Sequence, residues 1–251
     1  MKFSFSFILC CALLAISVQA QTTNSSSQQE TKKADPAAWN LLKSSRDTSQ
    51  NFPPNFAGVT TEVVLNDNGK ITKGLLSYEA GKGLDLKIEG LNEELKGWLN
   101  DQMVNVILHR RGGDFAKGDG RHPISFGEAD NSPLGRRILL NDPMKSSYRV
   151  RDNQIVEVDR TMAGIHFIIR VLDMTKTPEG KFLPHYFVMT SFDTSGQIKN
   201  SEAYTDEYKL VDGVWFPASR SVVHAENGQV SLRVIELHNP RIRFTSQQAT
   251  R

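Results

Sequence analysis

The strongest constraint on the fold is a long succession of short, alternating segments separated by tight-turn residues. Phe56–Leu65 and Ile71–Tyr78 alternate apolar and polar residues and flank Asn66-Asp67-Asn68-Gly69. Such runs around Asn-Gly or Asp-Gly are typical of β-hairpins with one buried face. Further turn signals lie at Asp152-Asn153, Thr194-Ser195-Gly196, Val211-Asp212-Gly213 and Glu226-Asn227-Gly228. The sequence therefore predicts an antiparallel meander of about ten strands.

One long segment departs from this pattern. Within Leu91–Leu108 the apolar residues recur near helical spacing, at Leu91, Leu95, Trp98, Leu99, Met103, Val106 and Ile107. This pattern predicts an amphipathic helix. Helical sequence for the crossovers of a parallel sheet is missing. We expect a mainly β (α+β) fold, a large curved antiparallel sheet or half-barrel with this helix packed on its concave face. A closed barrel and a two-sheet sandwich are the alternatives.

Two further segments refine this picture. Asp35-Pro36 is typical of a helix start, and we expect a short helix that ends near residues 45–49, before Pro53-Pro54. Leu183–Phe192 is apolar at successive positions. A strand of this kind is expected in the centre of a sheet, with both faces covered.

The N-terminus has the pattern of a cleavable export signal over residues 1–20. Lys2 is followed by an apolar run over Phe7–Val18, and Val18-Gln19-Ala20 supplies small residues at the cleavage position. A retained membrane anchor is one alternative, although the run is short for a span of about 20 residues. Lipid attachment at Cys10 or Cys11 is the other. We expect an exported protein, periplasmic or secreted.

The rest of the chain divides into three parts. Residues 21–35 are polar and are expected to form a disordered leader, residues 36–244 a single antiparallel β domain with helices, and residues 245–251 a flexible tail. Both cysteines lie in the signal, so the exported chain has none for disulfides or thiol chemistry. Its stability must come from its core.

Charge and motifs exclude several functional classes. The net charge of +2 is close to neutral, which argues against a nucleic-acid partner. No second apolar run has transmembrane length. The chain also lacks a phosphate-binding loop, a Gly-x-Ser-x-Gly elbow and a His-Glu-x-x-His zinc motif. The sequence thus predicts no cofactor, no metal and no catalytic residue.

The loop from His109 to His122 is the segment richest in reactive groups. It contains two imidazoles, two carboxylates and four basic residues among glycines. Metal binding by His109, His122 and an aspartate is disfavoured, because the ligand spacing is unusual and the nearby arginines would repel a cation. Anion binding is favoured over it, because converging backbone amides and arginines suit carboxylate or phosphate. A solvated, mobile connection between helix and strand is the leading interpretation.

A second group of charged residues lies on neighbouring predicted strands. Its arginines are Arg149, Arg151, Arg160 and Arg170. If these strands pair, some of the arginines share a face with His166 and with Glu157 or Asp159. Cross-strand ion pairs are the favoured interpretation, and the polar lining of a pocket is the alternative. The candidate ligand-binding residues are His109, Arg110, Arg149, Arg160 and His166.

Several short motifs resemble a known family. They are Asn51-Phe52-Pro53-Pro54-Asn55-Phe56, His109-Arg110, Ser146–Asn153, Asp206-Glu207-Tyr208 and Trp215-Phe216-Pro217. In combination they resemble the bacterial and plant family called domain of unknown function 3386, from about Trp39 to Asn239. The resemblance implies no reaction, cofactor or site. Its sheet-and-helix layout looks similar to periplasmic lipoprotein-carrier half-barrels, which hold acyl chains in an apolar concavity, but fold analogy alone does not fix function.

Three functions remain at this stage. The first is a non-enzymatic binding or carrier protein for an apolar, lipid-like small molecule. The second is an accessory module that binds another envelope protein. The third, least favoured, is a hydrolase or isomerase that uses His109 with Asp114 or Asp119.

Overall fold

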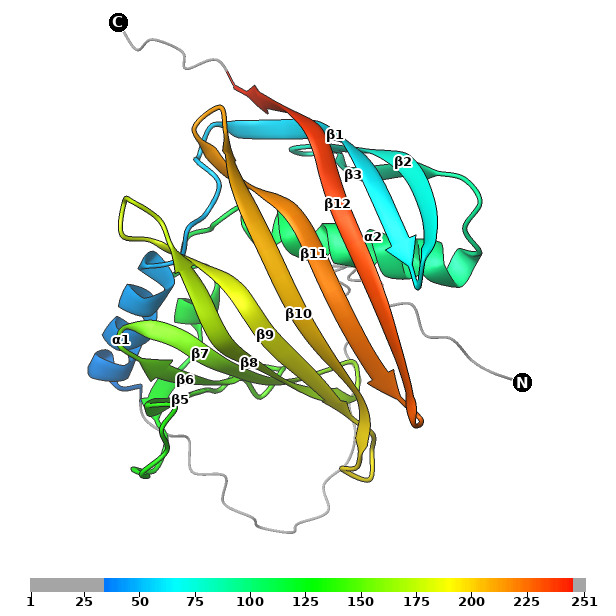
Figure 1. Ribbon diagram of the computed structural model, residues 1–251. Helices are drawn as coiled ribbons and strands as arrows, with labels where there is room; N and C mark the ends of the chain where they lie inside the picture. Colours follow the sequence, from blue (N-terminus) through cyan, green and yellow to red (C-terminus); the bar gives the residue numbers. More distant parts are fainter. Residues whose placement is uncertain (1–33, 246–251) are drawn as a thin grey trace, which may run out of the picture.

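A single antiparallel sheet of 12 strands and two α-helices make up most of the computed structural model, which describes residues 34–245 (Figure 1). The strand order across the sheet is β3-β2-β1-β12-β11-β10-β9-β8-β7-β6-β5-β4. Strands β3 and β4 are separate edges, so the sheet is open and neither a closed barrel nor a sandwich forms. The predicted signal peptide and most of the predicted leader and tail lie outside the described residues.

The elements follow one another along the chain with short connections. The helices are α1 (Pro36–Asp47) and α2 (Glu93–Leu108), and a 3-10 turn covers Asp119–Arg121. The strands are β1 (Phe56–Asp67), β2 (Lys70–Glu79), β3 (Gly83–Ile88), β4 (Ile124–Phe126), β5 (Arg136–Leu140), β6 (Ser147–Arg151), β7 (Gln154–Met162), β8 (Ile165–Lys176), β9 (Phe182–Phe192), β10 (Ile198–Val211), β11 (Val214–Glu226) and β12 (Gln229–Phe244).

Two-residue turns set the register of the meander. Asn68-Gly69 has φ angles of 49° and 97°, and Asn227-Gly228 has 51° and 72°. Two successive positive φ angles define the hairpin turn whose twist matches that of the strands, and Asn-Gly adopts it readily. Ala163-Gly164 forms a similar turn that the sequence signals did not indicate, because alanine seldom adopts positive φ.

The last strand, β12, begins at Gln229 and runs well past Leu237. It continues to Phe244 through Pro240, which has no amide hydrogen for the ladder. A register shift against β1 lies at this point, between the pairs Thr60↔Arg241 and Glu62↔His238. The shift leaves Asn239 and Pro240 as a bulge, where a proline is tolerated inside a sheet.

The caps of both helices explain where they begin. Asp35 accepts hydrogen bonds from the amides of Ala37 (2.8 Å) and Ala38 (3.4 Å), and Pro36 follows it. Asn92 caps α2 by accepting from the Leu95 amide at 2.8 Å, which moves its start from the predicted Leu91 to Glu93. Both predicted helices are confirmed.

Both helices pack on the same face of the sheet, which we call the inner face. The register places Tyr148, Val158, Ile169, Met189, Glu202 and His224 side by side on it. In Figure 1, α2 lies behind β11 and β12, and α1 lies at the other end of the sheet. This confirms the predicted curved antiparallel sheet with an amphipathic helix on one face.

Two separate apolar cores form under the two helices. Under α2, Leu99, Met103 and Ile107 pack with Leu76 and Phe216. Under α1, Ala38 and Leu42 pack with Ile138, Tyr148 and Val150. Neither core includes the inner-face residues of β8 and β9, although these strands are central in the sheet. The prediction that Leu183–Phe192 is covered on both faces was therefore wrong, because the helices lie to either side of this strand.

Candidate functional site

The inner face between the two cores carries a half-exposed apolar strip. We define this inner strip as Phe167, Ile169, Val171, Phe187 and Met189. All five side chains are only partly buried, whereas apolar residues under either helix are almost fully buried. Contiguous apolar surface left open beside polar groups is typical of a binding site rather than of a finished core.

One end of the strip meets a cluster around Tyr148. Arg160 of β7 is the direct cross-strand neighbour of Phe167. The guanidinium groups of Arg46 and Arg160 both donate to the Tyr148 hydroxyl, Arg46 at 2.9 Å. That hydroxyl donates to Asp119 Oδ2 at 2.8 Å, and Arg46 also pairs with the same carboxylate. The cluster thus joins α1, β6, β7 and the 109–122 loop.

The loop from His109 to His122 is accordingly held in place, contrary to the expectation of a mobile connection. Besides Asp119, Gly120 accepts a hydrogen bond from the Trp39 indole at 3.0 Å, and Phe115 packs edge-on against the Trp39 ring. Burial alone would raise the pKa of Asp119, but Arg46, Tyr148 and Arg160 hold it below its usual value. Burial raises the pKa of Tyr148, so its hydroxyl keeps its proton.

The other end of the strip meets a buried ion pair. Arg220 donates to Asp206 Oδ1 at 2.7 Å and to Oδ2 at 2.6 Å, and to Gln102 of α2 at 2.9 Å. The guanidinium lies over the ring of Tyr204, which stacks on Phe187 of the strip at 4.6 Å. Two-pronged contact with a carboxylate fixes the arginine firmly.

Arg110 and His109 lie between these two groups, just after α2. Arg110 is buried between the rings of Phe52 (4.7 Å) and Tyr208 (5.1 Å). Burial lowers the pKa of Arg110 to about 10, which leaves it charged at neutral pH. Burial, followed by the charges of Arg220, Arg160 and Arg46, lowers the pKa of His109, although part of its ring is exposed. The charges of these arginines therefore disfavour the protonated form of the imidazole.

A carboxylate–histidine pair extends the inner face beyond Arg220. His224 Nδ1 lies 3.1 Å from Glu202 Oε1, and the Tyr204 hydroxyl donates to Glu202 Oε2 at 2.6 Å. The hydrogen bond to Glu202 raises the pKa of His224. Burial alone would raise the pKa of Glu202, but His224 and Tyr204 hold it low.

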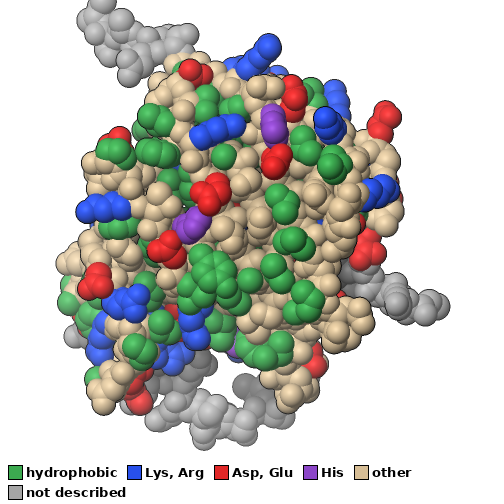
Figure 2. All heavy atoms as spheres, in the orientation of Figure 1, with side chains coloured by type: hydrophobic (Ala, Val, Ile, Leu, Met, Phe, Trp, Pro, Cys, Tyr) green, Lys and Arg blue, Asp and Glu red, His purple; other side chains and the backbone are tan. Residues whose placement is uncertain are grey.

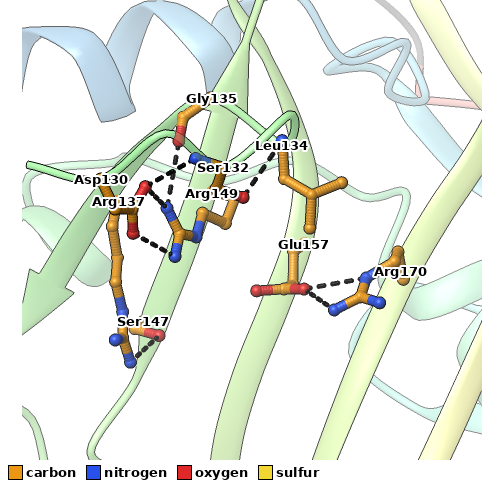
Figure 3. Close-up of polar contacts among 9 residues, drawn as sticks. All are labelled: Asp130, Ser132, Leu134, Gly135, Arg137, Ser147, Arg149, Glu157 and Arg170. Atoms are coloured by element: carbon orange, nitrogen blue, oxygen red, sulfur yellow. Dashed lines mark hydrogen bonds and ion pairs between the residues drawn. The ribbon is translucent and has the colours of Figure 1, made fainter.

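The other predicted residues lie on the opposite, outer face. Arg149 binds Asp130 with two 2.7 Å hydrogen bonds, which lower the pKa of Asp130 to about 2 (Figure 3). Arg170 pairs with Glu157 on the same face (Figure 3). His166 lies 2.9 Å from Asp159. The contacts of Arg170 with Glu157 and of His166 with Asp159 are cross-strand pairs of the kind favoured from the sequence, whereas Asp130 belongs to the loop before β5. Of the five candidates, the structure brings His109, Arg110 and Arg160 together and places Arg149 and His166 elsewhere.

The metal and hydrolase interpretations find no matching geometry. Within residues 34–245, no three His, Cys, Asp or Glu side chains gather as a metal site would require. Asp114 faces Lys117, and Asp119 is held by Arg46 and Tyr148. In this part of the chain neither carboxylate bonds to His109.

Two surface pockets lie away from these residues. One, of about 480 Å³, lies between the start of α1 and Gly120–Ile124. The other, of about 260 Å³, lies at the β3 edge beside Arg243. Neither pocket contains residues of the inner strip or the arginines beside it. The candidate site is therefore identified by its partly exposed apolar residues and its arginines, and not by the size of a pocket.

Comparison with protein families gives a match over most of the chain. Residues 33–242 match the family described as protein of unknown function (DUF3386). The chain belongs to this family. The resemblance predicted from the motifs is thus confirmed, and two inner-face residues of the site, Tyr148 and Asp206, lie within the motifs that carried it. Comparison of this DUF3386 member with curated proteins gives no match.

Solved structures with a similar arrangement are distant. A DUF1329 family protein from Desulfovibrio piger is 11% identical with a TM-score of 0.28, covering 87% of this chain and 97% of its own. A putative outer membrane lipoprotein-sorting protein domain from Vibrio parahaemolyticus is 7% identical with a TM-score of 0.31, covering 84% and 94%. MucA/MucB from Pseudomonas aeruginosa gives 8% identity and a TM-score of 0.19, covering 83% and 100%. Likenesses this weak carry no argument about the fold or the function of this chain.

Sequence reasoning missed four residues of the site, namely Arg46, Tyr148, Asp206 and Arg220. Two of them, Asp206 and Arg220, could have been found from their positions in the alternating pattern of their strands. Asp206 and Arg220 stand at positions whose neighbours along β10 and β11 point inward, such as Tyr204 and Val222. Charges at inward positions of adjacent strands indicate a buried pair. Arg46 gave no such signal, because its partners are far away in the sequence.

No helix within residues 34–245 combines the length and the apolar character that a membrane crossing needs.

Proposed function

We propose that this protein is a non-enzymatic binding or carrier protein for an apolar, lipid-like ligand that lies against the inner strip. The observation that carries the proposal is the partial exposure of five apolar side chains on the inner face, between the two packed cores. A ligand that covers Ile169 and Phe187 would recover the free energy of burying this surface, about 25 cal/mol per Å².

Native mass spectrometry and uptake of a fluorescent fatty acid test this proposal. Ile169→Asn should lower the uptake at least fivefold, because it places an amide in the strip. The matched control is Ile168→Asn, since Ile168 is the next residue along β8 and faces the outer side. Equal loss in both variants, or no uptake by the wild type, contradicts the proposal.

The proposed location is the periplasm or the exterior of the cell. It rests on the N-terminal sequence, where Lys2, the apolar run and Ala20 form the export pattern. Intact-mass measurement of the protein from an envelope fraction should give a chain that begins at Gln21. A mass that includes residues 1–20 contradicts cleavage and favours the anchor.

A role as an envelope accessory module is the second candidate, and a specific surface favours it. Val223, Val230 and Leu232 are 41%, 72% and 48% exposed on the outer face. Figure 2 shows hydrophobic side chains gathered on this face over β9–β12. Loss of a stoichiometric partner from pull-downs with Leu232→Asp, but not with Ile169→Asn, would support this role over the first.

A further inference from the structure

The cluster at Tyr148 has more positive than negative charge. Arg46 and Arg160 share one carboxylate, with Arg160 Nη2 3.7 Å from Asp119 Oδ1. Tyr148 adds no charge, because burial raises the pKa of its hydroxyl. Two guanidinium groups against one carboxylate leave one positive charge without a counterion.

Arg110 adds a second uncompensated charge. The only hydrogen bond of its side chain among the described residues is a long one, 3.4 Å from Nη2 to the Gln50 carbonyl. Asp206 attracts its charge only from beyond ion-pair distance. Its Nε and Nη1 atoms are buried without partners. By contrast, Arg220 is balanced by Asp206.

Arg46 and Arg160 meet at the Tyr148 hydroxyl, although they come from α1 and β7. Their charges, with that of Arg220, also lower the pKa of His109. Uncompensated charge in a poorly hydrated site costs free energy that a bound anion offsets. The carbonyls at the end of α2 would oppose an anion, but those of Ile107 and Leu108 already accept hydrogen bonds from the amides of Arg110 and Arg111.

The positively charged region is continuous with the inner strip and can be reached from solvent. The side chains of Arg46 and Arg160 are 41% and 22% exposed, and part of the His109 ring is exposed. Arg160 directly neighbours Phe167 across the strands. Arginine forks suit the two oxygens of a carboxylate or phosphate.

We propose that the ligand of the inner strip is an amphiphile with a single anionic head, a carboxylate or a phosphate, whose head binds Arg46, Arg160 and His109 while its apolar chain lies along Phe167, Ile169 and Phe187. This inference rests on the proposed function and adds the chemical class of the ligand. Arg220 is balanced by Asp206, and neither Arg220 nor Arg110 needs to touch the head.

Matched amphiphiles separate the head from the chain. Binding of dodecanoate, dodecyl phosphate and dodecanol to the full-length mature protein is measured by displacement of a neutral fluorescent apolar probe. Dodecanoate and dodecyl phosphate should bind at least tenfold more tightly than dodecanol. Acetate and inorganic phosphate alone should displace nothing, because they lack the chain.

Variants assign this preference to the cluster. Arg160→Gln should reduce the preference for dodecanoate over dodecanol to less than threefold, and Arg160→Lys should retain most of it. Arg149→Gln is the matched control, because Arg149 is a paired strand arginine on the outer face, and it should keep the full preference. If Arg160→Gln does not fold by circular dichroism, Arg46→Gln gives the same comparison.

The outcomes separate the two proposals. Equal binding of dodecanoate and dodecanol overturns the anionic head and leaves the apolar carrier standing. Displacement of the probe by acetate or inorganic phosphate alone overturns the proposal of an amphiphilic ligand, since it shows an anion site that does not require an apolar chain. Failure of the apolar probe itself to bind overturns the proposed function, and the inference with it.

Discussion

Arg220 and Asp206 form a two-pronged ion pair, with distances of 2.7 and 2.6 Å, between adjacent strands and almost out of contact with water. The pair lies under α2, where Gln102 satisfies a third donor of the guanidinium. Removing one partner leaves the other charge buried and unpaired, which costs more than the loss of an exposed ion pair.

Asp206→Asn should therefore lower the free energy of unfolding by about 3–5 kcal/mol. Urea unfolding measures this loss. The control is Asp47→Asn, which breaks the exposed Lys43–Asp47 pair and should cost less than about 1 kcal/mol. Similar losses of unfolding free energy in both variants would show that the buried pair of Arg220 and Asp206 matters no more than an exposed one.

His109 should titrate below its ordinary pKa of 6.5, because burial and three arginines disfavour its charged form. NMR of the imidazole measures this pKa. Arg160→Gln should raise it by removing one nearby positive charge, whereas Arg149→Gln on the outer face should leave it unchanged. A wild-type value above 6.5 would contradict the cluster of charges at His109.

The contact of His224 with Glu202 should make the fold less stable as the pH rises. The pKa of His224 is raised in the folded state by Glu202, so its contribution is complete below about pH 6.5 and is lost as the pH rises through the folded value. Unfolding free energies measured from pH 6 to 9 should fall more for the wild type than for His224→Gln. Parallel curves for the two proteins would show that the contact with Glu202 does not stabilise the fold.

Gly135 should tolerate no side chain. It has a φ of 80°, and an added Cβ would lie 2.2 Å from the Val150 carbonyl oxygen. Gly135→Ala should therefore lower the melting temperature more than Gly164→Ala, whose φ is 79° but whose surroundings are open. The control carries only the backbone strain, about 1–2 kcal/mol. Equal shifts in differential scanning calorimetry would mean that the strand end at Gly135 can move aside.

Much of the fold could be predicted because its signals are local. The hairpin at Asn68-Gly69 and the cap at Asp35 each depend on residues within a few positions, and both were identified from the sequence. The extension of β12 past Pro240 could not be predicted this way, because a bulge against β1 accommodates the proline.

The candidate site could be predicted only in part. His109 and Arg110 were singled out because they stand in a segment rich in charge, and Arg160 because it lies on a strand with other arginines. The separation of Arg160 from Arg149 required the register across β6 and β7, including the shift between Arg149 and Val150. A shift of one residue moves a side chain to the other face.

The sequence by itself determined most of the strands and turns and the start of α1, since alternation, capping and turn chemistry act over short distances. Only the tertiary structure decided that two helices cover the flanks of the inner face and leave Ile169 and Phe187 partly exposed between them. It also brought Arg46 to Asp119 and Tyr148, which are 73 and 102 residues away. Such contacts depend on how separate elements pack, and no local pattern encodes that packing.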